Sequence, residues 1–202
     1  MVKLKKEQIY IIGEIGLNHD GDINKAFRLI KSAKNAGFDA VKFQLRSKSD
    51  FCSEYNTGQR DLGSEIVDEY ISRTFIEFND YEKIYNYALN IGLECFFSVW
   101  DFESLEFSQK LKPKPRIYKI ASADLCNFIL LQKICSTNSH IILSTGMSSQ
   151  EEVEETINYL NNIKADYSLL HCHSAYPAPI HHINIKYINR LLEFEGSKYI
   201  GY

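Results

Sequence analysis

Short apolar runs alternate along this chain with longer segments in which apolar residues recur every three or four positions. Residues 9–12 form a β-branched and aromatic run, which predicts a buried strand. A loop rich in Gly, Asn and Asp follows at residues 13–22. Residues 24–36 then carry apolar side chains at helical spacing, and Gly37 comes directly after them, as is typical where a helix ends. The chain therefore opens with a strand followed by a helix.

The same unit repeats along the rest of the sequence. Further strands are predicted at residues 40–44, 93–97, 116–120, 140–143, 167–170 and 198–202. Further helices are predicted at residues 77–91, 102–111, 128–136, 150–161 and 185–193. Repeated strand–helix units imply a parallel sheet with right-handed crossovers. An open doubly wound sheet and a barrel both fit this pattern.

The number of units favours the barrel. About seven strands at roughly 30 residues per unit match a (β/α)8 TIM barrel, which takes about 250 residues. We therefore predict an α/β fold in which residues 1–202 form a single barrel domain, incomplete by about one strand and two helices. One connection, residues 45–74, is long and rich in Ser, Asp, Gly and Arg, which is typical of functional or mobile loops.

Composition narrows the class of protein. The 202 residues carry a formal net charge of -3 and are 45% hydrophobic, which suffices for one sizeable core. Charges of both signs are mixed along the chain, so no basic field indicates nucleic acid or anionic lipid. No apolar run approaches the roughly 20 residues of a membrane span, and the N-terminus lacks an apolar signal core. We predict a cytoplasmic protein with neither nucleic-acid nor membrane partners.

The cysteines support the same compartment. Five are scattered along the chain without any C-x-x-C pair, at Cys52, Cys95, Cys126, Cys135 and Cys172. Free thiols in a reducing compartment account for this pattern better than disulfides or a zinc site.

Polar residues gather where the predicted strands end. They are Glu14; Lys42 and Gln44; Ser98 and Asp101; Lys119, Ser122 and Asp124; Ser144 and Thr145; and His171, Ser174 and Tyr176. In a parallel barrel these ends converge on one face, where active sites lie. In an open sheet they would gather at one edge, though less tightly.

Two lysines within apolar strands indicate an anion site. Lys42 lies in Ala-Val-Lys-Phe-Gln and Lys119 in Ile-Tyr-Lys-Ile-Ala-Ser, where an unpaired ammonium group would be expensive to bury. Either lysine could instead pair with an internal acid such as Glu14, or extend from the strand end to water. Together with the neighbouring hydroxyl groups, the two lysines favour binding of a phosphate or carboxylate.

For several acidic residues and for His19, the sequence leaves more than one role open. Glu14 is the strongest candidate for handling a proton or a metal-bound water, or it is simply a partner for Lys42. Asp101 and Asp124 could cap the helices that follow them, and for Asp101 capping is the favoured role. His19 is either a loop hydrogen-bonding group or a site residue.

A second histidine cluster follows the sixth predicted strand. Strand alternation would put His171 and His173 on the same side, like a metal pair, although we favour no metal there. His181 and His182 lie in a turn-rich loop and are predicted at the surface. The prolines at 177 and 179 make a rigid connection that would hold Tyr176 over the strand-end face.

Five sequence blocks resemble the signature motifs of the N-acetylneuraminate (sialic acid) synthase family. The blocks are Ile-Gly-Glu-Ile-Gly-Leu-Asn-His-Asp-Gly at 12–21, Ala-Val-Lys-Phe-Gln at 40–44, Tyr-Lys-Ile-Ala-Ser-Ala-Asp at 118–124, Leu-Ser-Thr-Gly-Met at 143–147, and Leu-His-Cys-His-Ser-Ala-Tyr-Pro-Ala-Pro at 170–179. They occur in order over nearly the whole chain. Asp-Leu-Gly at 61–63 and Ser-Val-Trp-Asp at 98–101 resemble the bacterial branch that makes sialic, legionaminic and related nonulosonic acids.

The resemblance implies a transferase that forms a carbon–carbon bond between phosphoenolpyruvate and an N-acyl hexosamine such as N-acetylmannosamine. A divalent metal, Mn²⁺ or Mg²⁺, would polarise the sugar aldehyde. Glu14, Lys42 and Lys119 would be catalytic, and Asp124 would bind the sugar. The phosphoenolpyruvate site would be lined by Lys42, Ser98, Lys119, Ser122, Ser144, Ser174 and Tyr176.

The resemblance also implies features that these residues lack. The metal-binding histidines of the family would lie beyond Tyr202, so no metal ligand is assigned within the chain, and we expect it not to bind the ion normally. A C-terminal antifreeze-like domain, which completes the partner's site in homodimeric relatives, would also lie beyond it. We therefore expect this polypeptide alone to be poorly stable or inactive unless a second piece completes it.

Two other functions remain open on the sequence. One is another phosphoenolpyruvate-condensing barrel that acts on a sugar phosphate, although no surplus arginine is seen at the strand ends. The other is a non-catalytic remnant that binds a ligand or partner, for which phosphoenolpyruvate binding without phosphate release would be expected.

Overall fold

The computed structural model describes residues 9–48, 69 and 73–202. Most of the long connection predicted at 45–74 therefore lies outside the described residues, as do Cys52 and the Asp-Leu-Gly block at 61–63. The chain divides into two compact units, residues 1–115 and 116–202. The prediction that residues 1–202 form a single barrel domain stays a prediction.

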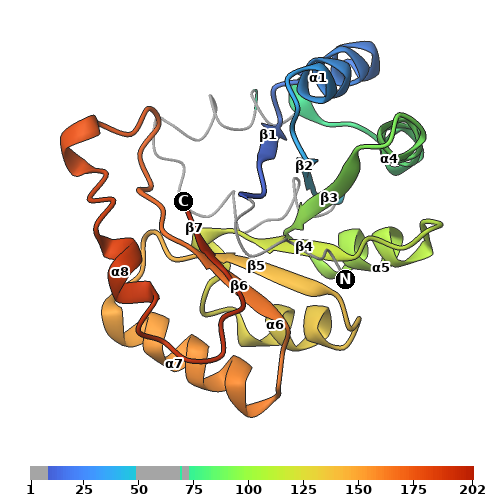
Figure 1. Ribbon diagram of the computed structural model, residues 1–202. Helices are drawn as coiled ribbons and strands as arrows, with labels where there is room; N and C mark the ends of the chain where they lie inside the picture. The colour runs from blue at the N-terminus through green and yellow to red at the C-terminus, as the bar shows by residue number, and fades with distance from the viewer. Residues whose placement is uncertain (1–8, 49–68, 70–72) are drawn as a thin grey trace. The chain divides into compact units, whose positions relative to one another are not determined.

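The described residues of the first unit form three parallel strands in sequential order, with a helix after each (Figure 1). Its strands are β1 (Ile12–Gly16), β2 (Ala40–Leu45) and β3 (Glu94–Val99). Its helices are α1 (Ile23–Asn35), α4 (Phe78–Asn90) and α5 (Phe102–Lys110). The register places Glu14 opposite Lys42 and Gln44 opposite Ser98.

The second unit repeats the pattern with four parallel strands, again in sequential order. Its strands are β4 (Ile117–Ile120), β5 (His140–Ser144), β6 (Tyr167–Leu170) and β7 (Ile200–Gly201). Its helices are α6 (Phe128–Cys135), α7 (Gln150–Asn162) and α8 (Tyr187–Leu191), with short 3₁₀ turns η2 (Ser122–Asp124) and η3 (Ile180–His182). Among the described helices, none has the length and apolar character needed to cross a membrane.

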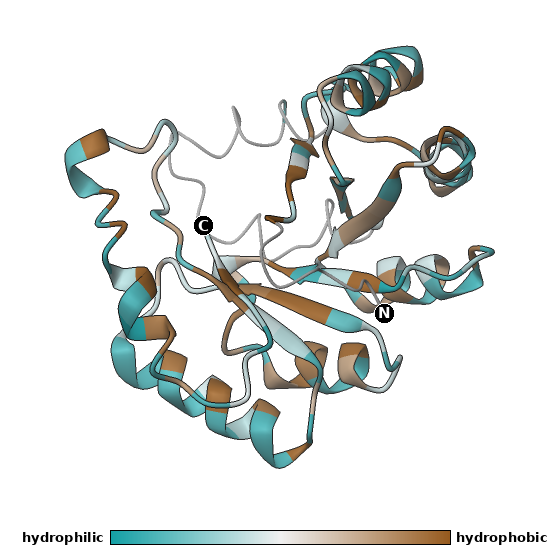
Figure 2. Ribbon diagram, viewed as in Figure 1, coloured by the Kyte–Doolittle hydropathy of each residue, from teal (hydrophilic) through white to brown (hydrophobic). Residues whose placement is uncertain are grey.

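Apolar burial drives this arrangement in both units. Strands β3 and β5 are predominantly hydrophobic, whereas α1 and α7 carry both hydrophilic and hydrophobic residues (Figure 2). The buried side of α7 comes from Val153, Ile157 and Leu160, whose spacing is that of one helix face. The helices thus cover their sheets with the apolar stripes that the sequence pattern predicted.

Side-chain caps fix where several helices begin. Asp22 accepts a hydrogen bond from the Asn24 backbone N–H at the start of α1. Ser149 and Glu152 form a reciprocal capping box at the start of α7, which satisfies two backbone groups that a helix end leaves unpaired. The Glu151 carboxyl in the same first turn accepts hydrogen bonds from backbone and side-chain donors, which hold its pKa below the ordinary value.

The first and last elements differ from the sequence prediction. β1 covers Ile12–Gly16 rather than residues 9–12, and Ile9 is 82% exposed. Glu14 therefore lies within the strand, not after it. The sequence pattern did not indicate this strand because it contains Gly13 and Gly16, and glycine is depleted in strands. In the structure, Gly13 packs closely on its neighbours: a Cβ there would lie 3.4 Å from the side chains of Phe38 and Val41.

The C-terminal elements are shorter than predicted. α8 covers only Tyr187–Leu191 of the predicted helix at 185–193, and β7 only Ile200–Gly201 of the predicted strand at 198–202. The Ile185 side chain is 53% exposed and that of Leu192 is 63% exposed, so the helix ends where its apolar positions stop being buried.

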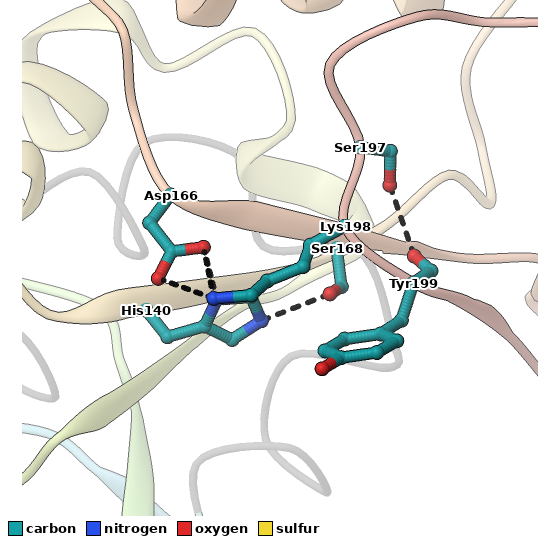
Figure 3. Close-up of polar contacts among 6 residues, drawn as sticks. All are labelled: His140, Asp166, Ser168, Ser197, Lys198 and Tyr199. Atoms are coloured by element: carbon teal, nitrogen blue, oxygen red, sulfur yellow. Dashed lines mark hydrogen bonds and ion pairs between the residues drawn. The ribbon is translucent and has the colours of Figure 1, made fainter. Parts of the chain in front are cut away.

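A polar network joins the amino-terminal ends of strands in the second unit (Figure 3). The His140 ring nitrogen Nδ1 lies 2.9 Å from Asp166 Oδ1, and Nε2 lies 2.9 Å from Ser168 Oγ. Lys198 Nζ donates to the same carboxylate at 3.2 Å. Burial lowers the pKa of His140, and the hydrogen bond to Asp166 opposes that shift. The network ties the start of β5 to the start of β6 and to the residues just before β7.

Candidate functional site

Lys42 is the centre of a polar group at the strand ends of the first unit. Its Nζ lies 2.7 Å from Glu14 Oε2 and donates to Ser98 Oγ at 3.1 Å. Lys42 is buried, with 5% exposure, whereas the Glu14 side chain is about half exposed. Parallel pairing in register puts Glu14 directly opposite Lys42, so both side chains leave the sheet on the same face. The pairing of Lys42 with Glu14, which the sequence left open as an alternative, is present in the structure.

Lys119 is the centre of a matching group in the second unit. Its Nζ donates to the Ile120 carbonyl at 2.6 Å and to Ser144 Oγ. The Cys172 thiol donates to the same Ser144 hydroxyl at 3.1 Å. These residues come from β4, from the end of β5 and from the segment after β6, so one group spans three neighbouring strand ends. A buried ammonium with a serine hydroxyl beside it is suited to binding an anion.

Gly146 lets two more serines approach this part of the second unit. A Cβ at Gly146 would overlap Ser174 Oγ and lie 2.9 Å from Ser122 Oγ and 3.2 Å from the Cys172 carbonyl oxygen. Only a residue without a side chain leaves this space open. Ser122, Ser144 and Ser174, all predicted to line an anion site, therefore lie around Gly146 and Cys172, two residues that the sequence analysis did not single out.

Asp124 has one carboxylate oxygen without a partner. Asp124 lies in η2, where Oδ1 accepts a hydrogen bond from Asn127 Nδ2 at 3.2 Å. Its Oδ2 is buried and has no hydrogen-bond partner in the part of the chain that the structure describes. A buried acceptor left unpaired is costly, so this oxygen is suited to a ligand hydroxyl. Tyr176, by contrast, is 99% exposed and is not brought to the serine group.

Asp101 has the capping role that the sequence favoured. Its carboxylate accepts hydrogen bonds from Ser104 N–H and Ser104 O–H, both at 2.8 Å, at the start of α5. It also accepts from the Ser47 backbone N–H at 2.9 Å. One side chain thus joins the segment after β2 to the helix after β3, and it stabilises the strand-end loops rather than providing a free carboxylate.

His19 is fully buried, and its ring contacts groups that hold the fold together. Its Nδ1 accepts a hydrogen bond from the Gly21 N–H at 3.2 Å. Its Nε2 lies 3.4 Å from the Tyr81 hydroxyl, which donates to the Gln44 carbonyl at 2.7 Å. Burial lowers the pKa of His19 to about 4. The ring is therefore neutral at physiological pH and fixes the loop after β1 against α4.

The later histidines do not form the strand pair considered from the sequence. β6 ends at Leu170, so strand alternation does not apply to His171 and His173, and that reasoning was wrong. His171 Nε2 lies 2.6 Å from the Ile183 carbonyl oxygen. His181 and His182 are exposed, as predicted. Within residues 9–48, 69 and 73–202, no three His, Cys, Asp or Glu side chains are arranged to hold a metal ion.

Comparison with known families decides the relationship. The model of the NeuB family matches residues 29–202. The chain belongs to the NeuB family. Among curated NeuB relatives, an uncharacterised protein of Methanocaldococcus jannaschii is 38% identical over 188 residues, which is 93% of this chain and 52% of that protein. The N,N'-diacetyllegionaminic acid synthase of Campylobacter jejuni is 33% identical over 189 residues, 90% of this chain and 56% of that enzyme. This chain therefore spans about half the length of the curated relatives it matches.

A solved NeuB-type structure shares the fold. The N-acetylneuraminic acid (sialic acid) synthetase of Leptospira borgpetersenii, crystallised with citrate, matches with a TM-score of 0.80 and 27% identity. The match covers 96% of this chain and 72% of that one. It confirms the predicted α/β fold, in which the described strands β1–β7 are those of a partial (β/α)8 barrel. The family resemblance carried by the five sequence blocks is confirmed as well.

Proposed function

We propose that this NeuB-family chain takes part in condensing phosphoenolpyruvate with an N-acyl hexosamine, such as N-acetylmannosamine, to give a sialic-acid-type nonulosonic acid and phosphate. Relatives named as legionaminic acid and N-acetylneuraminate-9-phosphate synthases support this chemistry. The proposed class is a phosphoenolpyruvate-dependent transferase working in the cytoplasm. The complete enzyme is proposed to be a homodimer.

The observation that carries the proposal is a pair of buried lysines, each beside a serine hydroxyl. Lys42 contacts Ser98, and Lys119 contacts Ser144. Phosphoenolpyruvate carries a carboxylate and a phosphate, and lysine ammonium groups with hydroxyl donors are suited to both. We propose that each group contributes to binding phosphoenolpyruvate, with Ser122 and Ser174 as further donors around Gly146.

The proposed reaction forms one carbon–carbon bond and breaks one carbon–oxygen bond. C3 of phosphoenolpyruvate attacks the aldehyde carbon of the open-chain sugar, and the aldehyde oxygen takes up a proton. Water adds at C2 and loses one proton, and phosphate then leaves with the electron pair of the C2–O bond while the remaining hydroxyl proton is lost, so that the C2 ketone forms. Glu14, half exposed and 2.7 Å from Lys42, is proposed to handle one of these protons. Asp124 is proposed to accept a hydrogen bond from a sugar hydroxyl through its unpaired Oδ2.

A divalent ion, Mn²⁺ or Mg²⁺, is proposed as the cofactor of the complete family enzyme, where it would polarise the sugar aldehyde. Within the described residues, no three His, Cys, Asp or Glu side chains are arranged to hold such an ion. The described side chains therefore do not fit that ion. What these residues do is bind the anion, orient it and move protons.

Binding of phosphoenolpyruvate to lysine variants tests the proposal. Lys42→Met and Lys119→Met keep the length of each side chain but remove its charge. Loss of a charge-assisted hydrogen bond is worth about 1.5–3 kcal/mol, so each variant should bind phosphoenolpyruvate roughly 10- to 100-fold more weakly in isothermal titration. Lys110→Met, at the exposed end of α5, is the matched control and should bind normally.

Phosphate release completes the test. Release of inorganic phosphate from phosphoenolpyruvate, dependent on N-acetylmannosamine and Mn²⁺, would support the full reaction. Normal phosphoenolpyruvate binding by both lysine variants would contradict the assignment of the site. Binding that depends on the lysines, without any phosphate release, would instead favour a ligand-binding role for this chain.

A further inference from the structure

Trp100 contains a polar atom that the site described so far does not use. It is the only tryptophan among the 202 residues and directly follows β3. Its indole Nε1 is buried and has no hydrogen-bond acceptor within the described part of the chain. A tryptophan N–H usually finds a partner when buried, and a buried donor without one forfeits a hydrogen bond that water would have supplied. The unpaired donor therefore needs an explanation.

The indole ring is held in place, so the unpaired donor is not a consequence of a loose side chain. The Arg46 guanidinium lies over the ring at 3.8 Å from its centroid, within the range of a cation–π contact. The next residue, Asp101, is fixed by hydrogen bonds to Ser104 and to the Ser47 backbone. The indole thus has a guanidinium against its face, and the residue that follows it is held by hydrogen bonds.

The position of Trp100 places this donor at the functional end of the first unit. Leu45 pairs with Val99 in the sheet, so Arg46 and Trp100 each come one residue after the paired strands end. Ser98, two residues before Trp100, bonds with Lys42. Carboxyl ends of parallel strands are where ligands bind in this class of fold. A ligand oxygen is therefore a reasonable acceptor for the indole N–H.

We propose that the Trp100 Nε1–H donates a hydrogen bond to an oxygen of the acceptor sugar and so helps to select it; this inference rests on the proposed function. The indole is uncharged and combines an apolar face with one donor. An N-acyl hexosamine is uncharged and offers many hydroxyl and carbonyl oxygens, whereas phosphoenolpyruvate suits the ammonium groups of the lysines. Trp100 is thus a specificity residue, distinct from the anion-binding lysines.

Trp100→Phe tests the proposal because it removes the N–H and keeps an aromatic ring. Since the indole N–H has no hydrogen-bond partner among the described residues, the thermal midpoint of the free protein should fall no more than expected for the change in ring size. Affinity for N-acetylmannosamine should fall roughly 5- to 100-fold, the effect of losing one good hydrogen bond to a ligand. Affinity for phosphoenolpyruvate should stay the same.

Tyr85→Phe is the matched control. Tyr85 is also aromatic and is buried in the first unit, but its hydroxyl donates to the Pro113 carbonyl at 2.9 Å. Removing that hydroxyl should lower the thermal midpoint and leave sugar affinity unchanged, the opposite pattern to Trp100→Phe. The pair of variants therefore separates a ligand-directed donor from a structural one.

The single tryptophan also gives a direct signal. Addition of N-acetylmannosamine to the unmodified protein should change the tryptophan emission and shift the indole N–H band in ultraviolet resonance Raman spectra towards the hydrogen-bonded position. Equal sugar affinity in Trp100→Phe, or no sugar binding by a protein that binds phosphoenolpyruvate, would overturn this proposal and leave the anion site standing. A protein that does not bind phosphoenolpyruvate would instead count against the proposed function itself.

Discussion

Acid should destabilise this protein through His19. The ring is fully buried, and its Nδ1 must be unprotonated to accept the hydrogen bond from Gly21. Burial lowers the pKa from 6.5 to about 4. Between these two values the unfolded chain binds a proton at His19 and the folded chain does not. Stability must therefore fall as pH drops from about 6.5 towards 4.

The size of the effect follows from the two pKa values. At pH 7.5 the His19 ring is neutral in both states and contributes almost nothing. At pH 5.0 the unfolded histidine is nearly all protonated, whereas the folded one is about nine-tenths neutral. The linkage relation then gives a loss of about 2 kcal/mol in the free energy of unfolding. This is a large share of the roughly 5–15 kcal/mol that stabilises a typical domain.

Urea unfolding at the two pH values measures this loss. His19→Asn removes the titrating ring and keeps a side-chain acceptor for the Gly21 N–H, so its own cost should be independent of pH. His140, whose pKa is also lowered, is present in both proteins and cancels. Between pH 7.5 and pH 5.0, the free energy of unfolding of the variant should fall by about 2 kcal/mol less than that of the unmodified protein. Equal losses in the two proteins would refute the reasoning.

Three further substitutions test other parts of the structure. Gly146→Ala should weaken phosphoenolpyruvate binding roughly tenfold, because the new methyl group pushes Ser122 and Ser174 apart; normal affinity in titration would contradict this. Asp101→Ala should lower the free energy of unfolding by about 1–2 kcal/mol through loss of the α5 cap, whereas Asp101→Asn, which can still cap, should lose less. Ser149→Ala breaks the capping box of α7 and should lose about 1 kcal/mol in urea unfolding, with Ser148→Ala, just outside the helix, as the unaffected comparison.

Most of the fold could be predicted because buried parallel strands leave a strong apolar signal. β6 begins and ends where the sequence predicted, and β2 differs by one residue. β1 was misplaced because its glycines serve close packing of the strand on its neighbours, a requirement set by tertiary contacts such as that of Gly13 with Phe38. The sequence pattern alone contains no trace of that contact.

The residue types of the candidate site could be predicted from the sequence, but most of their contact partners could not. The apolar surroundings of Lys42 and Lys119 marked both lysines as unusual, and the structure confirms that both are buried. The contact of Cys172 with Ser144 depends on how the segment after β6 lies against the end of β5. The unpaired Nε1 of Trp100 is likewise a property of packing, since nothing in the sequence marks that donor as lacking an acceptor.

The network of His140, Asp166 and Lys198 has a consequence for how this sheet can change over evolution. Its hydrogen bonds join the amino-terminal ends of β5 and β6 to the residues just before β7. Lys119 and Ser144, by contrast, lie towards the carboxyl-terminal ends of their strands. Substitutions near Lys119 and Ser144 should therefore leave the contacts of His140, Asp166 and Lys198 in place. The two ends of these strands can therefore change independently of each other during evolution.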